Sequence, residues 1–167
     1  VVRTGTDTDE ALAAGRIDLV VGGPHEKPRG SVRAETLLRD RFVALIGGRT
    51  LHGVSRLGAA RYAAATHVVV ARDERPTFVD EALRAHGLRR SIALVVPDFA
   101  SIPDAVASSE LVATVPSQLA RRMATRARLR ILPLALPLPA FEPRMYWHTR
   151  SDADPAATWL RGCVATL

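Results

Sequence analysis

The sequence predicts an α/β protein in which helices and strands alternate along the chain. Short apolar runs recur between turn residues, as in buried strands, and the segments between them have helical spacing with capping residues and glycine stops. Hydrophobic residues make up 47% of the 167 positions, enough to bury a core in one domain or in two small lobes. The pattern is that of βαβ units.

The first four predicted elements lie within the first 48 residues. TDTDEALAAG, residues 6–15, predicts a helix with Thr6 or Thr8 as N-cap and Gly15 as its stop. IDLVVGG, residues 17–23, predicts a buried strand. VRAETLLRDRFVALIGG then predicts two extended pieces that are broken at Arg39-Asp40.

The same alternation continues through the middle of the chain. Helices are predicted at 54–63 (weakly), at 77–87, from Ser101-Ile102-Pro103 onward, and at 116–124, with strands at 67–71, 91–96 and 111–115. In LRILPLALPLP, residues 129–139, a short strand is expected to run into a proline-rich connector, because proline is disfavoured in central strands and helix interiors.

The last two elements hold much of the aromatic content. Alternation in RMYWHTR predicts a strand with Met145, Trp147 and Thr149 on one face and Tyr146, His148 and Arg150 on the other. A C-terminal helix is predicted to start at Asp154 (N-cap) and Pro155. It is expected to dock through an apolar stripe of Trp159, Leu160, Cys163, Val164 and Leu167.

Charge and composition exclude several classes of protein. The net charge is +6, nearly all from arginine, and the densest basic stretch, ARRMATRARLR, has no interleaved aromatic residues for base stacking. It is interpreted as a solvated helix face, with a phosphate-contacting surface as the alternative. The single cysteine favours a reducing, intracellular setting. The polar first residues and the lack of an apolar run of about 20 residues predict a soluble chain with no membrane contact.

Catalytic and metal-binding patterns are not found in the sequence. There is no G-x-S-x-G elbow, and Cys163 is expected to be buried and inert in its apolar stripe. The histidines are scattered without metal-ligand spacing. We therefore expect no enzyme activity, no metal and no cofactor.

Five segments together carry a resemblance to a known family. LAAGRIDLVVGG, RFVALIG, FVDEALRAHGL, ELVATVPSQLA and YWHTRSDADPAATWLR resemble the effector-binding domain of LysR-type transcriptional regulators, in particular the branch that responds to nodulation flavonoids and salicylate-like aromatics. The resemblance implies two Rossmann-like lobes joined by two crossover strands, the type 2 periplasmic-binding-protein fold. It assigns residues 1–42 and 151–167 to lobe I, 49–141 to lobe II, and 43–48 and 142–150 to hinge strands.

The resemblance also implies that parts of the family's protein lie outside this sequence. The first strand and helix of lobe I are expected before Val1, so that lobe I is incomplete here. The winged helix-turn-helix that reads DNA and its linker helix are expected there too.

The family places its effector between the lobes, which suggests residues for that role here. Thr6 and Thr8 would hold an acidic group, and Arg72 (or Arg75) would pair with a carboxylate, against the alternatives of helix caps and surface arginines. Pro76 and Thr77 stand where salicylate-sensing relatives have a Gly- and His-containing loop, which makes salicylate itself doubtful. The remaining candidates are Pro97, Asp98, Phe99, Tyr146 and His148, with Trp147 in place of its neighbours if the register shifts by one. Ordinary core aromatics and a structural histidine are the alternatives for these.

The function implied is ligand sensing. A small organic effector, aromatic or carboxylate, would bind between the lobes and modulate DNA binding by a cytoplasmic homodimer or homotetramer. The alternative is a periplasmic solute-binding protein with the same fold, which would need a signal peptide. An enzyme on this scaffold would need an acid, base or nucleophile set that the sequence does not show.

Overall fold

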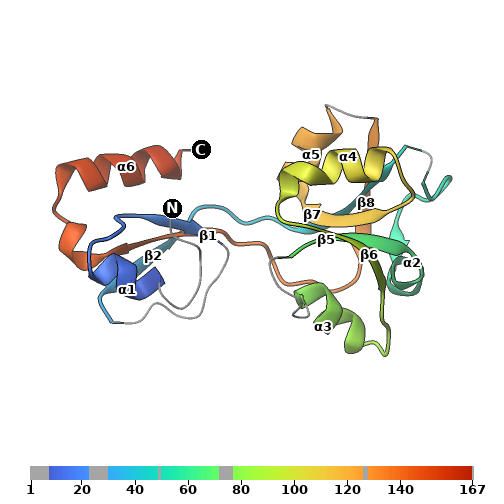
Figure 1. Cartoon of the computed structure of the whole chain (residues 1–167), viewed down its shortest axis with the longest axis horizontal. Coiled ribbons are helices and arrows are strands. Elements are labelled where there is room, and N and C mark those ends of the chain that lie inside the picture. The colour runs from blue at the N-terminus through green and yellow to red at the C-terminus, as the bar shows by residue number, and fades with distance from the viewer. Residues whose placement is uncertain (1–7, 23–29, 49, 72–76, 126–127, 167) are drawn as a thin grey trace. The chain divides into compact units, whose positions relative to one another are not determined.

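The computed structural model describes residues 8–22, 30–48, 50–71, 77–125 and 128–166. The chain divides into two compact units (Figure 1). Unit 1 comprises Val1–Arg39 and Phe141–Leu167, and unit 2 comprises Asp40–Ala140. The lobe boundaries suggested by the family resemblance stay a prediction. No helix in the described ranges has the length and apolar character needed to cross a membrane.

Unit 1 is built on a three-stranded antiparallel sheet in the order β1-β9-β2. Its elements are α1 (Thr8–Ala13), β1 (Val20–Gly22), β2 (Val32–Thr36), β9 (Arg144–His148), the 3-10 turn η2 (Thr149–Ser151) and α6 (Pro155–Ala165). Leu12, Val32 and Tyr146 form its buried core. The predicted helix stop is confirmed: Gly15 has a φ of +73°, a conformation that glycine adopts at little cost.

Unit 2 is a six-stranded mixed sheet in the order β4-β8-β3-β7-β5-β6. Its strands are β3 (Phe42–Gly47), β4 (Leu57–Gly58), β5 (Thr66–Val70), β6 (Ser91–Val96), β7 (Val112–Pro116) and β8 (Leu129–Ala135). Its helices are α2 (Ala59–Ala64), α3 (Phe78–Arg84), η1 (Phe99–Ser101), α4 (Ile102–Ala107) and α5 (Ser117–Ala124). These elements confirm the predicted alternation of strands and helices.

Helices cover both faces of the unit 2 sheet (Figure 1). Strand β3 lies inside the sheet, so its alternate side chains enter two separate cores. Ala44 and Ile46 pack in the core that also contains residues of α2 and α3, whereas Val43 and Leu45 pack with residues of α4 and α5. The run FVALIG is therefore apolar throughout because it is buried on both faces.

The segment around Pro133 corrects the sequence prediction. It was expected to become a connector, but β8 continues through Pro133 to Ala135 and pairs with both β3 and β4. The pairing explains why proline is tolerated there. β4 pairs with β8 only at Leu134 and Ala135, so at Pro133 the strand has β3 alone as a neighbour. A residue without an N–H is tolerated where a strand has a hydrogen-bonding neighbour on one side only.

Two strand predictions in unit 1 also need correction. The strand predicted at 17–23 begins only at Val20, and it is not buried on both faces, since the Val21 side chain is 50% exposed. The alternation predicted through Arg150 stops at His148, where the chain turns into η2. Thr149 and Arg150 therefore do not continue the two faces of the strand.

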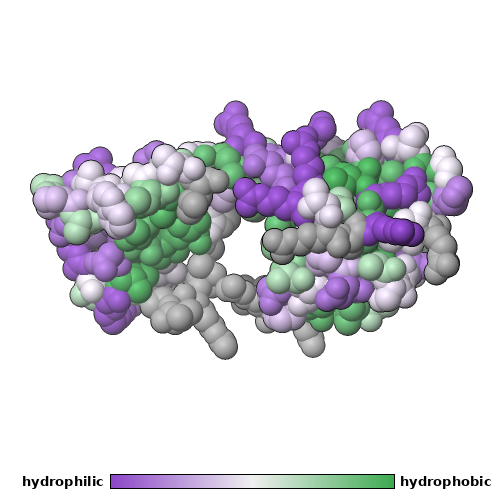
Figure 2. Space-filling view, turned by 90° about the horizontal axis from the view of Figure 1, so that it is seen from above, coloured by the Kyte–Doolittle hydropathy of each residue, from purple (hydrophilic) through white to green (hydrophobic). Residues whose placement is uncertain are grey.

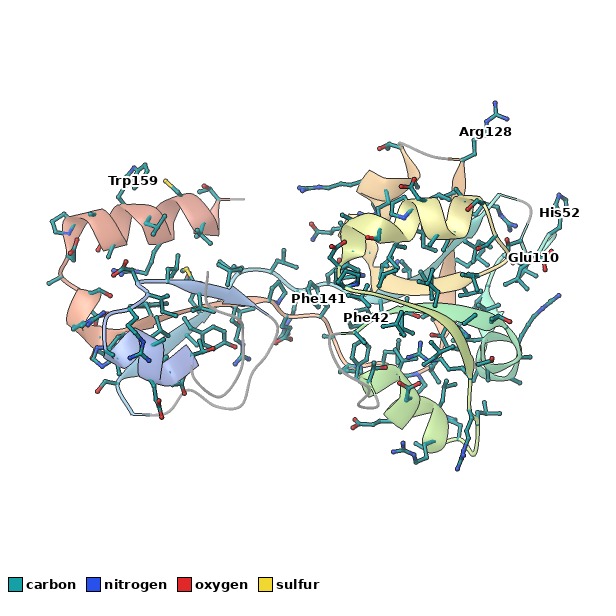
Figure 3. The ribbon with its side chains drawn as sticks, in the orientation of Figure 1. Phe42, His52, Glu110, Arg128, Phe141 and Trp159 are labelled. Atoms are coloured by element: carbon teal, nitrogen blue, oxygen red, sulfur yellow. The ribbon has the colours of Figure 1, made fainter. Side chains whose placement is uncertain are left out.

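The C-terminal helix forms as predicted but does not dock. Asp154 caps it by accepting the N–H groups of Ala156 and Ala157. Its expected contact face is exposed: Trp159 is 70% exposed and points away from the sheet, and Cys163 is exposed rather than buried (Figure 3). Apolar surface is accordingly visible on this unit in Figure 2. No described residue of the chain covers this stripe well enough to bury it.

Candidate functional site

The loops of unit 2 gather at one edge of its sheet. Strands β5, β6 and β7 are parallel, so their carboxyl ends at Val70, Val96 and Pro116 lie at the same edge. Strand β3 runs antiparallel to β7, which brings Phe42 opposite Pro116 at that edge. In α/β sheets, ligands bind outside the carboxyl ends of the strands. We call this edge the carboxyl edge; its described residues are 40–42, 77–80, 97–101 and 116–118.

Each of the three helices that begin at the carboxyl edge is capped by an aspartate of the chain itself. Asp80 accepts the Thr77 N–H at the start of α3 (2.8 Å), and Asp98 accepts the Ser101 N–H at η1 (3.1 Å). Asp40 accepts the N–H of Gln118 (2.8 Å) at the start of α5. The positive ends of these helices therefore already have carboxylate partners.

Asp40 is held by several groups at once. Besides the Gln118 N–H it accepts the hydroxyl of Ser117 and the N–H of Arg41. Partial burial acts to raise its pKa, but these hydrogen bonds and the nearby Arg121 guanidinium outweigh burial and leave the pKa of Asp40 below its ordinary value. Asp40 is therefore an ionised carboxylate at neutral pH.

A buried arginine fixes the start of α3. The side chain of Arg90 is 2% exposed and donates to Asp80 (Nε–Oδ1 2.7 Å) and to the Thr77 hydroxyl (2.9 Å). Burial acts to raise the pKa of Asp80, but hydrogen bonds from Arg90 and Thr77 prevail and lower it to about 2. Arg90 also donates to the hydroxyl of Tyr62, which shares a hydrogen bond with Thr114 of β7. This network ties α3 to the interior of unit 2.

Two phenylalanines lie against each other at the carboxyl edge. The rings of Phe42, at the start of β3, and Phe78, the first residue of α3, have centroids 4.5 Å apart and planes tilted by 34°. Phe78 is 38% exposed, and Phe42 is partly buried. Figure 3 shows Phe42 at one end of unit 2, with Glu110 at the other. The pair forms an aromatic wall that is exposed at Phe78.

The residues of unit 2 predicted to contact an effector lie at this edge but differ in their hydrogen bonds and burial. Thr77 donates both its N–H and its hydroxyl hydrogen to Asp80, so it has no polar hydrogen left for a ligand. Asp98 caps η1, Pro97 is exposed, and Phe99 is half-buried against the core beside α4. The structure thus brings Thr77, Pro97, Asp98 and Phe99 to one edge, and their contact with an effector stays a prediction.

The predicted residues of unit 1 have structural partners. Thr8, at the first position of α1, is 7% exposed, and Tyr146 is 3% exposed within the core. His148 accepts the Arg150 N–H through Nδ1. Trp147 donates to Asp152 at 2.8 Å, and the Arg161 guanidinium lies 5.0 Å from its ring centroid. Buried Tyr146 offers little surface to a ligand.

Several predicted residues lie outside the described part of the chain. These are Thr6, Arg72, Arg75 and Pro76. Their proposed contacts with an effector remain predictions.

A cavity lies at the opposite edge of the unit 2 sheet. It has a volume of about 420 Å³ and is lined by Gly47, Gly48, Thr50, Ala107, Ser108, Ser109, Glu110 and Arg128. Ser108 and Ser109 donate to carbonyls of α4, so their hydroxyl hydrogens are already used. Among the described residues, no group of three or more His, Cys, Asp or Glu side chains could hold a metal ion.

Sequence reasoning missed Asp40, Phe42, Phe78, Asp80 and Arg90 as members of the site. Phe78 and Asp80 were assigned to a helix, and the capping box formed by Thr77 and Asp80 was a recognisable signal. Arg90 gave no signal, because only the folded chain shows that this arginine, 10 residues from Asp80, turns inward.

Comparison with solved structures defines the class of domain. The chain resembles a probable transcriptional regulator from Pseudomonas aeruginosa with a TM-score of 0.86 and 27% identity, over 100% of this chain and 55% of that one. It also resembles the regulatory domain of MexT, a transcriptional activator in the same organism, with a TM-score of 0.80 and 30% identity, over 95% of this chain and 76% of that one. This is an α/β effector-binding domain of the type 2 periplasmic-binding-protein fold.

Its sequence identifies the family. The chain belongs to the LysR substrate binding domain family, which matches residues 1–167. Nodulation protein D 1 of Rhizobium tropici is 34% identical over 160 residues, covering 95% of this chain and 52% of that protein. Nodulation protein D 2 of the same organism is also 34% identical, over 93% of this chain. The chain thus spans about half the length of these relatives.

Proposed function

We propose that this chain is the ligand-sensing part of a LysR-type transcriptional regulator. The observation that carries the proposal is the family match over the whole chain, together with 34% identity to the nodulation protein D 1 relative. The effector is a small organic molecule with an aromatic ring. The Phe42–Phe78 wall at the carboxyl edge supports this choice, because a planar ring packs well against such a pair.

The proposed protein acts without catalysis, in the cytoplasm, by controlling DNA binding. DNA contact would be made by a separate domain of a longer protein. The nodulation protein D 1 relative has room for such a domain, because the chain matches only about half of its length. An effector changes the equilibrium between two conformations of such a protein only if it binds one of them more tightly than the other. A periplasmic solute-binding protein with this fold is not favoured, because the relatives with the higher identities are regulators.

A screen of ring compounds tests the effector proposal. A panel of substituted benzoates, phenols and cinnamic acids is added to the chain, and the thermal midpoint is followed. A compound at 100 times its dissociation constant stabilises the fold by about 2.7 kcal/mol, so at least one member should raise the midpoint by several degrees. Phe78→Ala should abolish that rise, whereas Trp159→Ala, which removes an exposed aromatic ring of unit 1, should not. A folded wild-type chain that no compound stabilises contradicts the proposal.

We further propose that the regulator is a homodimer or homotetramer, with β6 in its interface. β6 is the last strand of the unit 2 sheet, and Ile92, Leu94 and Val95 on it are 44%, 39% and 56% exposed. An apolar strand left at a sheet edge favours pairing with another chain.

Val95→Lys tests this interface. The lysine charge should lower the mass measured by light scattering from that of an oligomer to that of a monomer at micromolar concentration. Ala107→Lys, at an exposed site at the end of α4, should leave the oligomer intact. An unchanged mass for Val95→Lys places the interface elsewhere.

A further inference from the structure

We infer that Asp40 is a specificity-determining residue, which makes the carboxyl edge prefer neutral aromatic ligands over aromatic carboxylates. The inference rests on the proposed function and deepens it, because that proposal leaves the charge of the effector open. It is carried by the contacts of the described residues of unit 2.

Several hydrogen-bond donors beside the aromatic wall already have carboxylate partners. A carboxylate ligand needs donors, and a helix start usually supplies them. Here Asp40 takes the N–H of Gln118 and the hydroxyl of Ser117, and Asp80 takes both polar hydrogens of Thr77. The Thr77, Ser117 and Gln118 donors near Phe42 and Phe78 are therefore already used by carboxylates.

The aromatic wall also has negative charge near it. Asp40 precedes Phe42 by two residues, and Asp80 follows Phe78 by two residues, so each ring of the wall has a carboxylate close to it in the chain. An anionic ligand on the wall next to Asp40 would be repelled by its carboxylate, which costs binding free energy. The Arg90 charge is neutralised by Asp80 inside unit 2, and the Arg121 guanidinium acts on Asp40 itself. A neutral ring that donates hydrogen bonds avoids this cost and finds acceptors.

Asp40 rather than Asp80 sets the preference for neutral ligands. Asp80 is paired with buried Arg90 at 2.7 Å, so its charge is largely compensated. Asp40 has no ion pair within 4.0 Å among the described residues, and its partners are two N–H groups and a hydroxyl. The charge of Asp40 is therefore less compensated than that of Asp80, with Arg121 as the cation that acts on it.

The test uses two probes of equal size, 2-naphthamide and 2-naphthoate, titrated into the 167-residue chain at pH 7 by calorimetry. The wild-type chain should bind the neutral amide at least about tenfold tighter than the carboxylate. Asp40→Asn keeps an oxygen acceptor for the cap but removes the charge. This substitution should strengthen binding of the carboxylate, so that the two affinities differ by about threefold or less. Glu110→Gln removes one negative charge at the opposite edge and should leave the ratio unchanged.

The outcomes separate this inference from the function on which it rests. Equal or tighter binding of the carboxylate by the wild-type chain overturns the charge preference but leaves ligand sensing in place. The same holds if Asp40→Asn and Glu110→Gln change the ratio equally. If neither probe binds the folded wild-type chain, the aromatic wall is not a ligand surface, and both the inference and the aromatic effector are overturned.

Discussion

Replacing Arg90 by methionine is expected to lower the free energy of unfolding by about 3 kcal/mol, because breaking one side of a buried ion pair leaves its partner uncompensated. Arg90 is 2% exposed on its side chain and bonds to Asp80, Thr77 and Tyr62. For a unit of this size, that loss corresponds to a fall of roughly 12–24 °C in the thermal midpoint. Urea unfolding followed by circular dichroism measures it.

The neighbouring arginine provides the control. Arg89 is exposed, and Arg89→Met should change the free energy of unfolding by less than about 0.5 kcal/mol. A similarly small loss for Arg90→Met shows that the ion pair with Asp80 does not hold α3 in place. Loss of aromatic-ligand binding in Arg90→Met below the unfolding transition would link the network to the carboxyl edge.

Acid is expected to destabilise unit 2 through His67. This residue is 0% exposed, its Nε2 lies 2.8 Å from the Tyr62 carbonyl oxygen, and burial lowers its pKa from 6.5 to about 4. Between these values the unfolded chain binds a proton that the folded chain excludes, so stability is complete above pH 6.5 and falls as the pH drops toward 4. The shift corresponds to a loss of about 3 kcal/mol. Asp80, with a pKa of about 2, adds a second loss below pH 4.

Urea unfolding of His67→Gln at pH 7 and pH 4 isolates the histidine. Glutamine can still donate to the Tyr62 carbonyl but does not titrate, so the difference between the two pH values should shrink by about 3 kcal/mol. Ile102→Val, a core change in the same unit, should lower stability at both pH values and keep the difference. A full acid loss in His67→Gln would assign the effect to other groups.

Local patterns in the sequence predicted the elements of the fold because each pattern has a local cause. The apolar run at Phe42–Gly47 predicted a strand buried on both faces, and Gly15 and Gly87 predicted helix stops that their positive φ angles confirm. The predictions that failed depended on distant partners. Pro133 stays in a strand because β4 is absent beside it, and the apolar stripe around Trp159 finds no described partner to bury it.

The candidate site was less predictable than the fold. The family resemblance pointed to loops that the structure does bring together at the carboxyl edge, including Thr77 and Asp98. Sequence spacing could not show that Asp40 would cap a helix 78 residues away or that Phe42 would meet Phe78. The Asp40 contact follows from the antiparallel register of β3 and β7, which only the folded sheet fixes. The Phe42 contact depends on where α3 packs beside β3.

Amide chemical shifts during a titration with 2-naphthamide test most directly whether the carboxyl edge is the ligand surface of unit 2. The account predicts that the largest changes fall at Phe42, at Thr77–Asp80, at Phe99–Ser101 and at Ser117–Gln118. Changes centred on Gly47, Thr50 and Ser109 instead, around the cavity at the opposite edge, would contradict it.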